Sequence, residues 1–108
     1  MKRVISATIA ISAVACGSTD VHEVLLARPG APSREVAVYA EGQALPRPAR
    51  DVALLQVFAT GSDAAPSTVL RALGGRGAEL GCDAVVRARV DEGRTMSVGY
   101  AVCVRWSP

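Results

Sequence analysis

An uncharged and mostly apolar run near the N-terminus constrains this chain most, because residues of such a run are not expected to belong to the folded domain. Lys2 and Arg3 are followed by residues 4–15, a stretch of 12 residues without a charge. A basic start before a short apolar run is typical of a secretory signal peptide, whereas a membrane-spanning helix needs about 20 apolar residues. We therefore expect residues 1–15 to be a signal peptide that is removed on export, so that the fold is built from the rest of the chain.

The residues around Cys16 predict a lipid anchor. The run Ala13-Val14-Ala15-Cys16 is similar to a lipobox, with the small residue before the cysteine that the cleaving peptidase needs, although Leu is usual where Ala13 stands. On this interpretation Cys16 is lipidated and begins the mature chain, which at least two acyl chains hold on the membrane without a transmembrane helix. The alternative is an ordinary signal peptide cleaved at the same place, which leaves Cys16 unmodified.

An anchored, exported chain belongs to the bacterial cell envelope, on the periplasmic face of a membrane. Gly17 follows the cysteine, in place of the Asp that retains lipoproteins of enteric bacteria in the inner membrane, and this favours the outer membrane. From Cys16 onward, ten Arg balance ten Asp and Glu. Because phosphate binding needs a net basic surface, the neutral mature chain argues against a nucleic-acid partner.

Turn-forming residues at the start of the mature chain predict a flexible tether. Residues 17–20 read Gly-Ser-Thr-Asp and residues 28–33 read Arg-Pro-Gly-Ala-Pro-Ser, both typical of turns and linkers, with room for a short strand at residues 24–26. We therefore expect a signal peptide over 1–15, a lipidated N-terminus and tether over 16–33, and one small domain over 34–108.

The apolar pattern of that domain predicts four strands and one helix. The strands are expected at residues 35–40, 51–60, 83–90 and 98–106, with the second as the most apolar and central one. Between the second and third strands, apolar residues recur at helical spacing over residues 67–80, with Asp63 or Ser67 to cap the start and Gly81 to end it. The order strand-strand-helix-strand-strand predicts an α+β fold, a small antiparallel sheet with the helix packed on one face.

Alternation also assigns residues of the last two strands to the two faces of the sheet. One face receives the apolar residues Ala84, Val86, Ala88, Val90, Val98, Tyr100, Val102, Val104 and Trp106. The other face receives Arg87, Arg89 and Arg105, which would form a cationic stripe for a partner or for lipid headgroups. The alternative for these three arginines is an ordinary solvated sheet face.

Two segments of the C-terminal half carry a family resemblance. They are AELGCDAVVRARVD, at residues 78–91, and GYAVCVRW, at residues 99–106. Their turn-and-strand and final-strand motifs resemble the YbjQ-like superfamily, which includes RcsF-like stress-sensor lipoproteins of the outer membrane. The resemblance covers about residues 34–107. It implies a small β-α-β-β domain, a lipid anchor in one branch of the family and ring-like homo-oligomers in another.

Cys82 and Cys103 remain after lipidation, an even number in an oxidising compartment. A disulfide between them is one interpretation, and Cys103 resembles a disulfide cysteine of the stress-sensor branch. Alternation opposes the pairing, because Cys103 falls on the face of Arg105 while Cys82 continues the face of Ala84. The alternative is two buried free thiols, which pack as small hydrophobes.

No catalytic or metal-binding motif stands out from the rest of the chain. The only histidine, His22, lies in the expected tether, so no Ser-His-Asp or Cys-His set is possible in the domain, and no metal site is expected. The run Gly74-Gly75-Arg76-Gly77 lacks the Lys and Ser or Thr of a phosphate-binding loop. Close packing or a helix defect is the simpler explanation of these glycines.

We therefore expect a non-enzymatic envelope lipoprotein, a membrane-anchored protein-interaction or sensor module that needs no cofactor. Its partner would be another envelope protein or a second copy of the chain. The alternative is a metal- or small-ligand-binding envelope module.

Overall fold

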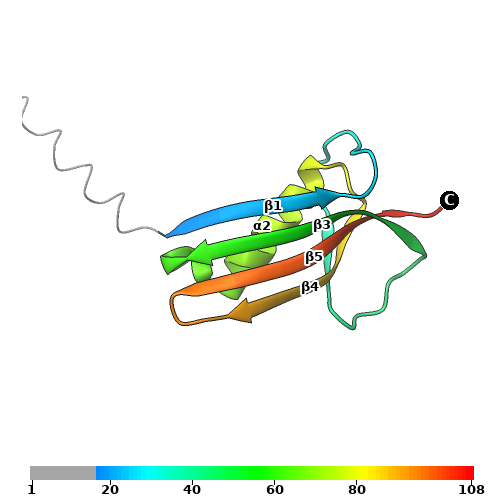
Figure 1. Ribbon diagram of the computed structural model, residues 1–108. Helices are drawn as coiled ribbons and strands as arrows, with labels where there is room; N and C mark the ends of the chain where they lie inside the picture. The colour runs from blue at the N-terminus through cyan, green and yellow to red at the C-terminus, as the bar shows by residue number, and fades with distance from the viewer. Residues whose placement is uncertain (1–16) are drawn as a thin grey trace, which may run out of the picture.

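Residues 17–108 are those that the computed structural model describes, and both the expected signal peptide and Cys16 lie outside them. Figure 1 shows the strands side by side as one twisted sheet, with the long helix behind it. The elements in chain order are β1 (Ser18–Leu25), β2 (Ala37–Ala40), β3 (Ala49–Thr60), the 3-10 helix η2 (Gly61–Ala64), α2 (Pro66–Glu79), β4 (Ala84–Glu92) and β5 (Met96–Trp106).

The five strands form one mixed sheet in the order β1-β3-β5-β4-β2. Neighbouring strands are antiparallel, except that β2 runs parallel to β4. The α+β class and the helix on one face are therefore confirmed. β3 is an interior strand, between β1 and β5, although β5 is the middle strand of the sheet. The expectation of about four antiparallel strands is wrong in two respects. The sheet has a fifth strand, because β1 adds an edge. It is also not wholly antiparallel, because the Pro-containing loop after β2 carries the chain across the sheet and leaves β2 parallel to β4.

β1 lies inside the segment where turn-forming residues predicted a tether, so that prediction is wrong for this strand. β1 pairs with β3 along its whole length. Its polar side chains find partners there, because the hydroxyls of Ser18 and Thr60 bond at 2.8 Å and Thr19 donates to Asp63 at 2.8 Å. Ser18 and Thr19 therefore serve in an edge strand because neighbouring elements take up their hydrogen bonds.

The rest of the expected tether wraps around the C-terminal end of α2. The N–H of Gly30 donates to the carbonyl of Leu80 at 2.9 Å, and the N–H of Ser33 donates to that of Ala78 at 2.8 Å. The approach is close enough that a Cβ on Gly81 would press on the backbone of Gly30. The segment before β2 is thus part of the packed domain.

α2 lies where the helical spacing predicts it and packs its apolar stripe on the sheet, with Val69 and Leu73 fully buried. Neither Asp63 nor Ser67 caps its start, where no side chain bonds to the N-cap position and Pro occupies the first turn instead. Gly81 ends the helix as expected, because its φ of +72° lies in the left-handed region that favours glycine.

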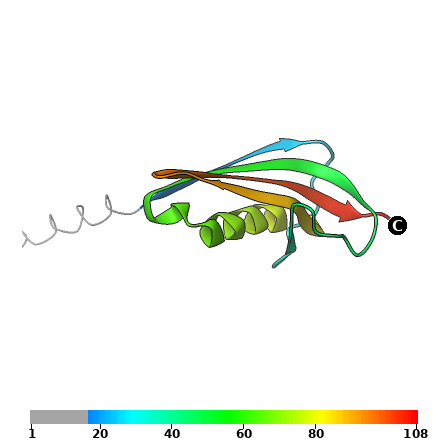
Figure 2. The ribbon, with the colours of Figure 1, turned by 90° about the horizontal axis from the view of Figure 1, so that it is seen from below.

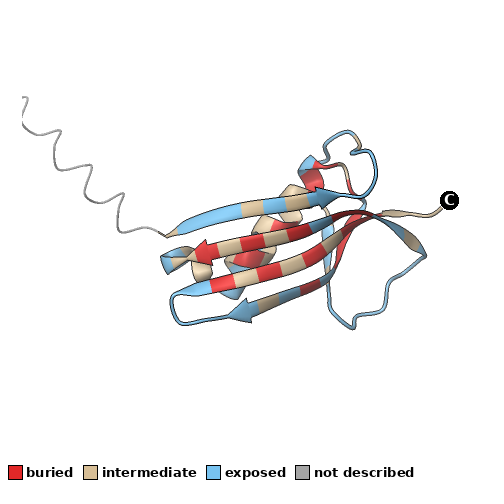
Figure 3. Cartoon of the chain, in the orientation of Figure 1, coloured by how far each residue is buried: buried red, intermediate tan, exposed pale blue. Residues whose placement is uncertain are grey.

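α2 covers one face of the sheet, and no segment of residues 17–108 forms a layer over the other face (Figure 2). Along β3 and β5, buried residues alternate with more exposed ones (Figure 3). The main core under α2 consists of Val52, Ala53, Leu55, Val57, Ala59, Val69, Leu73, Leu80, Cys82, Val85, Ala88, Ala101 and Cys103. A smaller cluster on the other face consists of Ala84, Val86 and Val104, with Tyr39, Ala49, Val102 and Trp106 packed against it.

A β-bulge in β4 overturns the expected assignment of residues to faces. Arg87 has a φ of 53°, and the pairing of β4 with β5 shifts register between Val86 and Arg89. An extra residue in a strand exchanges the faces of the residues beyond it. Ala88 and Val90, beyond the bulge, therefore pack towards α2, whereas Ala84 and Val86, before it, lie on the uncovered face.

β5 presents its small residues to α2 and its large residues to the uncovered face. The small residues are Ser97, Gly99, Ala101 and Cys103. Gly99 is required because a Cβ there would overlap Val69 and would lie 3.2 Å from Leu73. The face that large residues predicted to be the core is thus the one that α2 leaves uncovered.

Candidate functional site

The uncovered face carries apolar side chains that no described residue encloses. Paired residues on neighbouring strands point to the same side of a sheet. The register sets Val24 beside Leu54, and Leu54 beside Val102. Two further rows of the register are His22, Gln56 and Tyr100, and Asp20, Phe58 and Val98. We call the following set the open-face patch: His22, Val24, Leu54, Phe58, Val98, Tyr100 and Val102.

The open-face patch exposes large aliphatic side chains, with Val24 59% exposed and Leu54 44% exposed. Leu54 belongs to β3, a strand with neighbours on both sides, so its exposure arises from the missing layer and not from a sheet edge. A contiguous apolar surface of this kind marks an interaction site in soluble domains. Beside it lies a hollow of about 240 Å³, lined by His22, Glu23, Val24, Leu54, Leu55, Gln56 and Tyr100.

The rings of the open-face patch are held in place by neighbours. His22 and Phe58 meet edge to face, with ring centroids 5.7 Å apart. The guanidinium of Arg89 lies over the ring of Tyr100, 4.8 Å from its centroid, within the range of a cation–π contact. Arg89 also pairs with Asp91 at 3.3 Å. Contacts with neighbouring side chains therefore hold these rings in place, and Asp91 partly neutralises the charge of Arg89 beside the patch.

The cationic stripe expected from Arg87, Arg89 and Arg105 is not present, because these residues do not share a face. Arg87 pairs with Asp51 at 3.3 Å, and Arg89 lies over the patch as described. Arg105 lies on the side of α2, against Gly30, and its Nε is buried without a hydrogen-bond partner among the described residues. The bulge at Arg87 and the regular alternation of β5 separate the three side chains.

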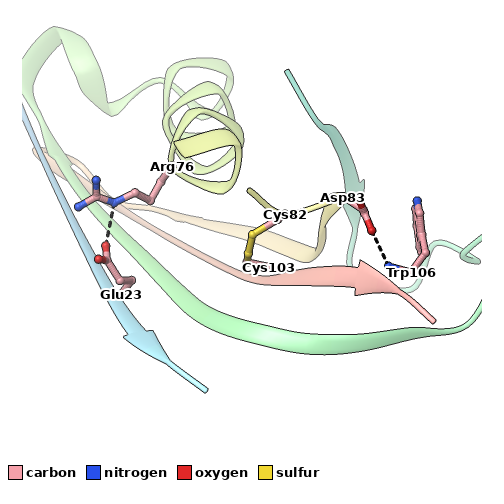
Figure 4. Close-up of a disulfide and its surroundings, with 6 residues drawn as sticks. All are labelled: Glu23, Arg76, Cys82, Asp83, Cys103 and Trp106. Atoms are coloured by element: carbon pink, nitrogen blue, oxygen red, sulfur yellow. Dashed lines mark hydrogen bonds and ion pairs between the residues drawn. A yellow bond between two sulfur atoms is a disulfide. The ribbon is translucent and has the colours of Figure 1, made fainter. Parts of the chain in front are cut away.

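Cys82 and Cys103 are joined in a disulfide, with Cα atoms 5.7 Å apart (Figure 4). Cys82 lies in the turn that ends α2, and Cys103 lies on the α2-facing side of β5, so both belong to the main core. The face conflict noted from the sequence disappears because Cys82 precedes β4 and does not continue the face of Ala84, which belongs to the smaller cluster. With exposed fractions of 3% and 0%, the bridge fastens α2 to the sheet.

An ion pair fastens the edge strand to the helix. Arg76 on α2 donates to Glu23 on β1 at 2.7 Å (Figure 4) and to Glu79 at 2.8 Å. The hydrogen bond to Glu79 raises the pKa of Arg76 above its usual value, and the charge and hydrogen bond of Glu23 act in the same direction against partial burial. Arg76, from the glycine-rich run, thus has a structural role.

Residues 17–108 contain no group of three or more His, Cys, Asp or Glu side chains that could hold a metal ion. His22 lies in β1 against Phe58. Among the same residues, no helix combines the length and the apolar character needed to cross a membrane.

The sequence reasoning missed the open-face patch because it assigned large residues to the core. One signal does mark the patch: in β5, large residues alternate with Ser, Gly, Ala and Cys. A helix can pack closely only on the small side, so the large side is the one left open. The alternation of large and small residues thus indicates which face packs against a helix, and the alternation of apolar and polar residues alone does not.

Comparison of the chain with protein-family models, curated proteins and solved structures finds no match. Membership of the YbjQ-like superfamily therefore stays a prediction from the two sequence segments that resemble it.

Proposed function

We propose that this protein is a non-enzymatic lipoprotein of the bacterial cell envelope that needs no cofactor, and that its open-face patch binds a second copy of the same chain. The observation that carries the binding function is the exposure of Val24 and Leu54 in line on neighbouring strands. The envelope location rests on the signal peptide over 1–15 and on lipidation of Cys16, and the resemblance to RcsF-like lipoproteins supports it.

The size of the uncovered face suits a partner with the same flat surface. Four strands about 4.8 Å apart, each about eight residues long at about 3.3 Å per residue, present on the order of 500 Å² in projection. Accessible surface exceeds its projection, and a standard interface buries about 800 Å² per partner. Two sheets packed face to face about 10 Å apart thus approach the size of a stable dimer interface.

Charge also favours a second copy. From Cys16 onward the chain is neutral, so two copies do not repel each other through net charge. On and beside the uncovered face, Arg87 and Arg89 are each paired with a carboxylate. Asp20 lies on the edge strand β1, so the centre of the face offers apolar contact without an uncompensated charge to bury.

Substitution of Leu54 tests the binding function. Leu54→Arg places a charge in the centre of the open-face patch and should shift the mature chain, in density-matched detergent, from dimer to monomer in sedimentation equilibrium. Leu45→Arg is the matched control, because Leu45 is 39% exposed and lies in the loop between β2 and β3. It should leave the dimer unchanged.

Two outcomes would refute this proposal. A wild-type chain that stays monomeric at its highest soluble concentration would exclude the second copy, and so would equal dissociation of the two variants. The location is tested separately by intact-mass analysis of the chain recovered from membranes. A product that begins at Cys16 and carries the mass of acyl chains is expected, whereas an unmodified Cys16 would refute the anchor.

The hollow beside Tyr100 favours a small apolar ligand as the alternative function. Its lining combines Leu54 and Val24 with the polar His22. Both self-association and ligand binding predict that a fluorescent apolar probe binds the Leu45→Arg control and does not bind a Leu54→Arg monomer. Saturation at one probe per monomeric wild-type chain would favour the ligand.

A further inference from the structure

The first strand begins almost at the proposed lipid anchor. β1 starts at Ser18, so only Gly17 separates it from Cys16. Consecutive Cα atoms are about 3.8 Å apart, which leaves the anchored residue within about 8 Å of the strand. The domain therefore has no tether of its own to hold it away from the membrane surface.

Hydrogen bonds fix the start of β1 to one end of the sheet. The N–H of Gly17 donates to the hydroxyl of Ser62 at 3.1 Å, and the N–H of Ser18 donates to that of Thr60 at 3.2 Å. The contact is close, since a Cβ on Gly17 would overlap the carbonyl oxygen of Thr60. The point of attachment thus belongs to the end where β3 passes into η2.

The turn between β4 and β5 lies at the same end of the sheet (Figure 1). The register sets Ser18 beside Thr60, and Thr60 beside Met96. Two strand spacings of about 4.8 Å place Met96 about 10 Å from the start of β1. Met96 is 43% exposed, and the neighbouring Arg94 is exposed as well.

We infer that this end of the sheet, formed by η2 and residues 93–96, rests on the lipid surface. Met96 enters the boundary between headgroups and acyl chains, and Arg94 lies at the level of the lipid phosphates. Two carboxylates near this end are already engaged, Asp63 by Thr19 and Asp91 by Arg89, while Glu92 stays exposed. The inference rests on the proposed lipidation of Cys16.

Spin labels at two positions of matched exposure test the contact. In the lipidated full-length product, Cys16 is alkylated and Cys82 and Cys103 are bridged, so a cysteine introduced at position 96 or 45 is the free thiol. Leu45 is 39% exposed and lies beyond the start of β3, whose 12 residues span about 36 Å. With vesicles of phosphatidylethanolamine and phosphatidylglycerol, the Met96→Cys label should become more accessible to oxygen and less accessible to a nickel chelate. The Leu45→Cys label should stay as it is in water.

A lengthened connection provides the second variant. A Gly-Ser insert of about eight residues between Cys16 and Gly17 has a typical end-to-end distance of roughly 15 Å. This insert should return the label at position 96 to its aqueous accessibility while flotation with the vesicles is kept. Protection that survives the insert would overturn the inference that the short connection holds this end on the lipid.

Failure of the inference and failure of the proposed anchor give different results. A chain that floats with the vesicles while both labels stay in water refutes the lipid contact and leaves the anchor standing. A chain that does not float refutes lipidation of Cys16, and the inference falls with it.

Discussion

Two glycines of α2 allow the packing between helix and sheet to be measured by one pair of substitutions. A Cβ on Gly75 would meet nothing within 4 Å, whereas a Cβ on Gly77 would overlap a methyl group of Val85. Both positions lie inside α2 and neither has a positive φ. Gly75→Ala and Gly77→Ala therefore make the same change to helix propensity and differ only in what the new methyl group touches.

The expected free energies follow from these surroundings. Replacing Gly by Ala inside a helix stabilises the folded state by roughly 0.5–1 kcal/mol, so Gly75→Ala should raise the free energy of unfolding by that amount. Gly77→Ala gains the same propensity, but overpacking of a close contact costs about 1–3 kcal/mol. Because the propensity gain cancels between the two variants, their difference should equal the overpacking cost at Val85.

Thermal unfolding followed by circular dichroism measures this difference. For a domain of this size, 1 kcal/mol corresponds to a shift in Tm of roughly 4–8 °C. Gly75→Ala should melt above the wild type. Gly77→Ala should melt at least roughly 4–8 °C below Gly75→Ala, because the overpacking costs at least about 1 kcal/mol. Equal melting temperatures for the two variants would refute the placement of Gly77 against β4. A Gly75→Ala variant less stable than the wild type would refute a continuous helix over Pro66–Glu79.

Three further variants probe the sheet and its cross-link. Val86 is 2% exposed, so Val86→Asp buries an unpaired carboxylate at a cost of at least about 3 kcal/mol, although on the face away from α2. Arg87→Asp should cost only about 1 kcal/mol, because it replaces the exposed pair with Asp51 by two carboxylates that water screens from each other. Urea midpoints that coincide for Val86→Asp and Arg87→Asp would contradict this. The disulfide closes a loop with a sequence separation of 21, so replacing both Cys82 and Cys103 by Ala should lower the free energy of unfolding by about 3 kcal/mol or more. An unchanged urea midpoint for the double variant would show that the bridge does not constrain the unfolded chain.

Local signals predicted the elements that depend on local physics. Apolar periodicity placed α2 and β3 within a few residues of their observed bounds, and Gly81 marked the end of the helix. In each case the pattern and the cause lie within the same short segment. Local pattern also predicted β4, β5 and the polar turn between them, for the same reason.

What the sequence did not reveal depends on contacts between distant segments. Nothing in the sequence of β2 indicates that this strand lies beside β4. The polar residues of β1 can form a strand because Thr60 and Asp63 bind their side chains through hydrogen bonds. The bulge at Arg87 is a single residue, yet it moves Ala88 and Val90 to the side of α2 and separates them from Val86. The open-face patch was assigned to the core for a different reason, because the large residues of β5 were expected to face α2, whereas its small residues do so. The pairing of Cys82 with Cys103 was left undecided because strand alternation alone placed the two cysteines on opposite faces.

The anchor restricts how two copies can pack through the open-face patch. Two sheets face each other with two-fold symmetry about an axis that runs either along the strands or across them. An axis across the strands would place the two starts of β1 at opposite ends of the dimer. Lipidated chains in one membrane need both starts at the same end, so the axis must run along the strands. β1 of one copy then lies over β4 of the other, and β3 lies over β5.

A pair of single cysteines distinguishes the two arrangements. With the axis along the strands and sheets about 10 Å apart, strand spacings place the two copies of Val102 about 11 Å apart and the two copies of Val24 about 17 Å apart. A bifunctional thiol reagent with a reach between these distances should link Val102→Cys into covalent dimers in vesicles and should leave Val24→Cys monomeric on a non-reducing gel. If Val24→Cys is linked as readily as Val102→Cys, then β1 faces β1. In that case the two anchors lie at opposite ends, and the dimer and the shared membrane cannot both be correct.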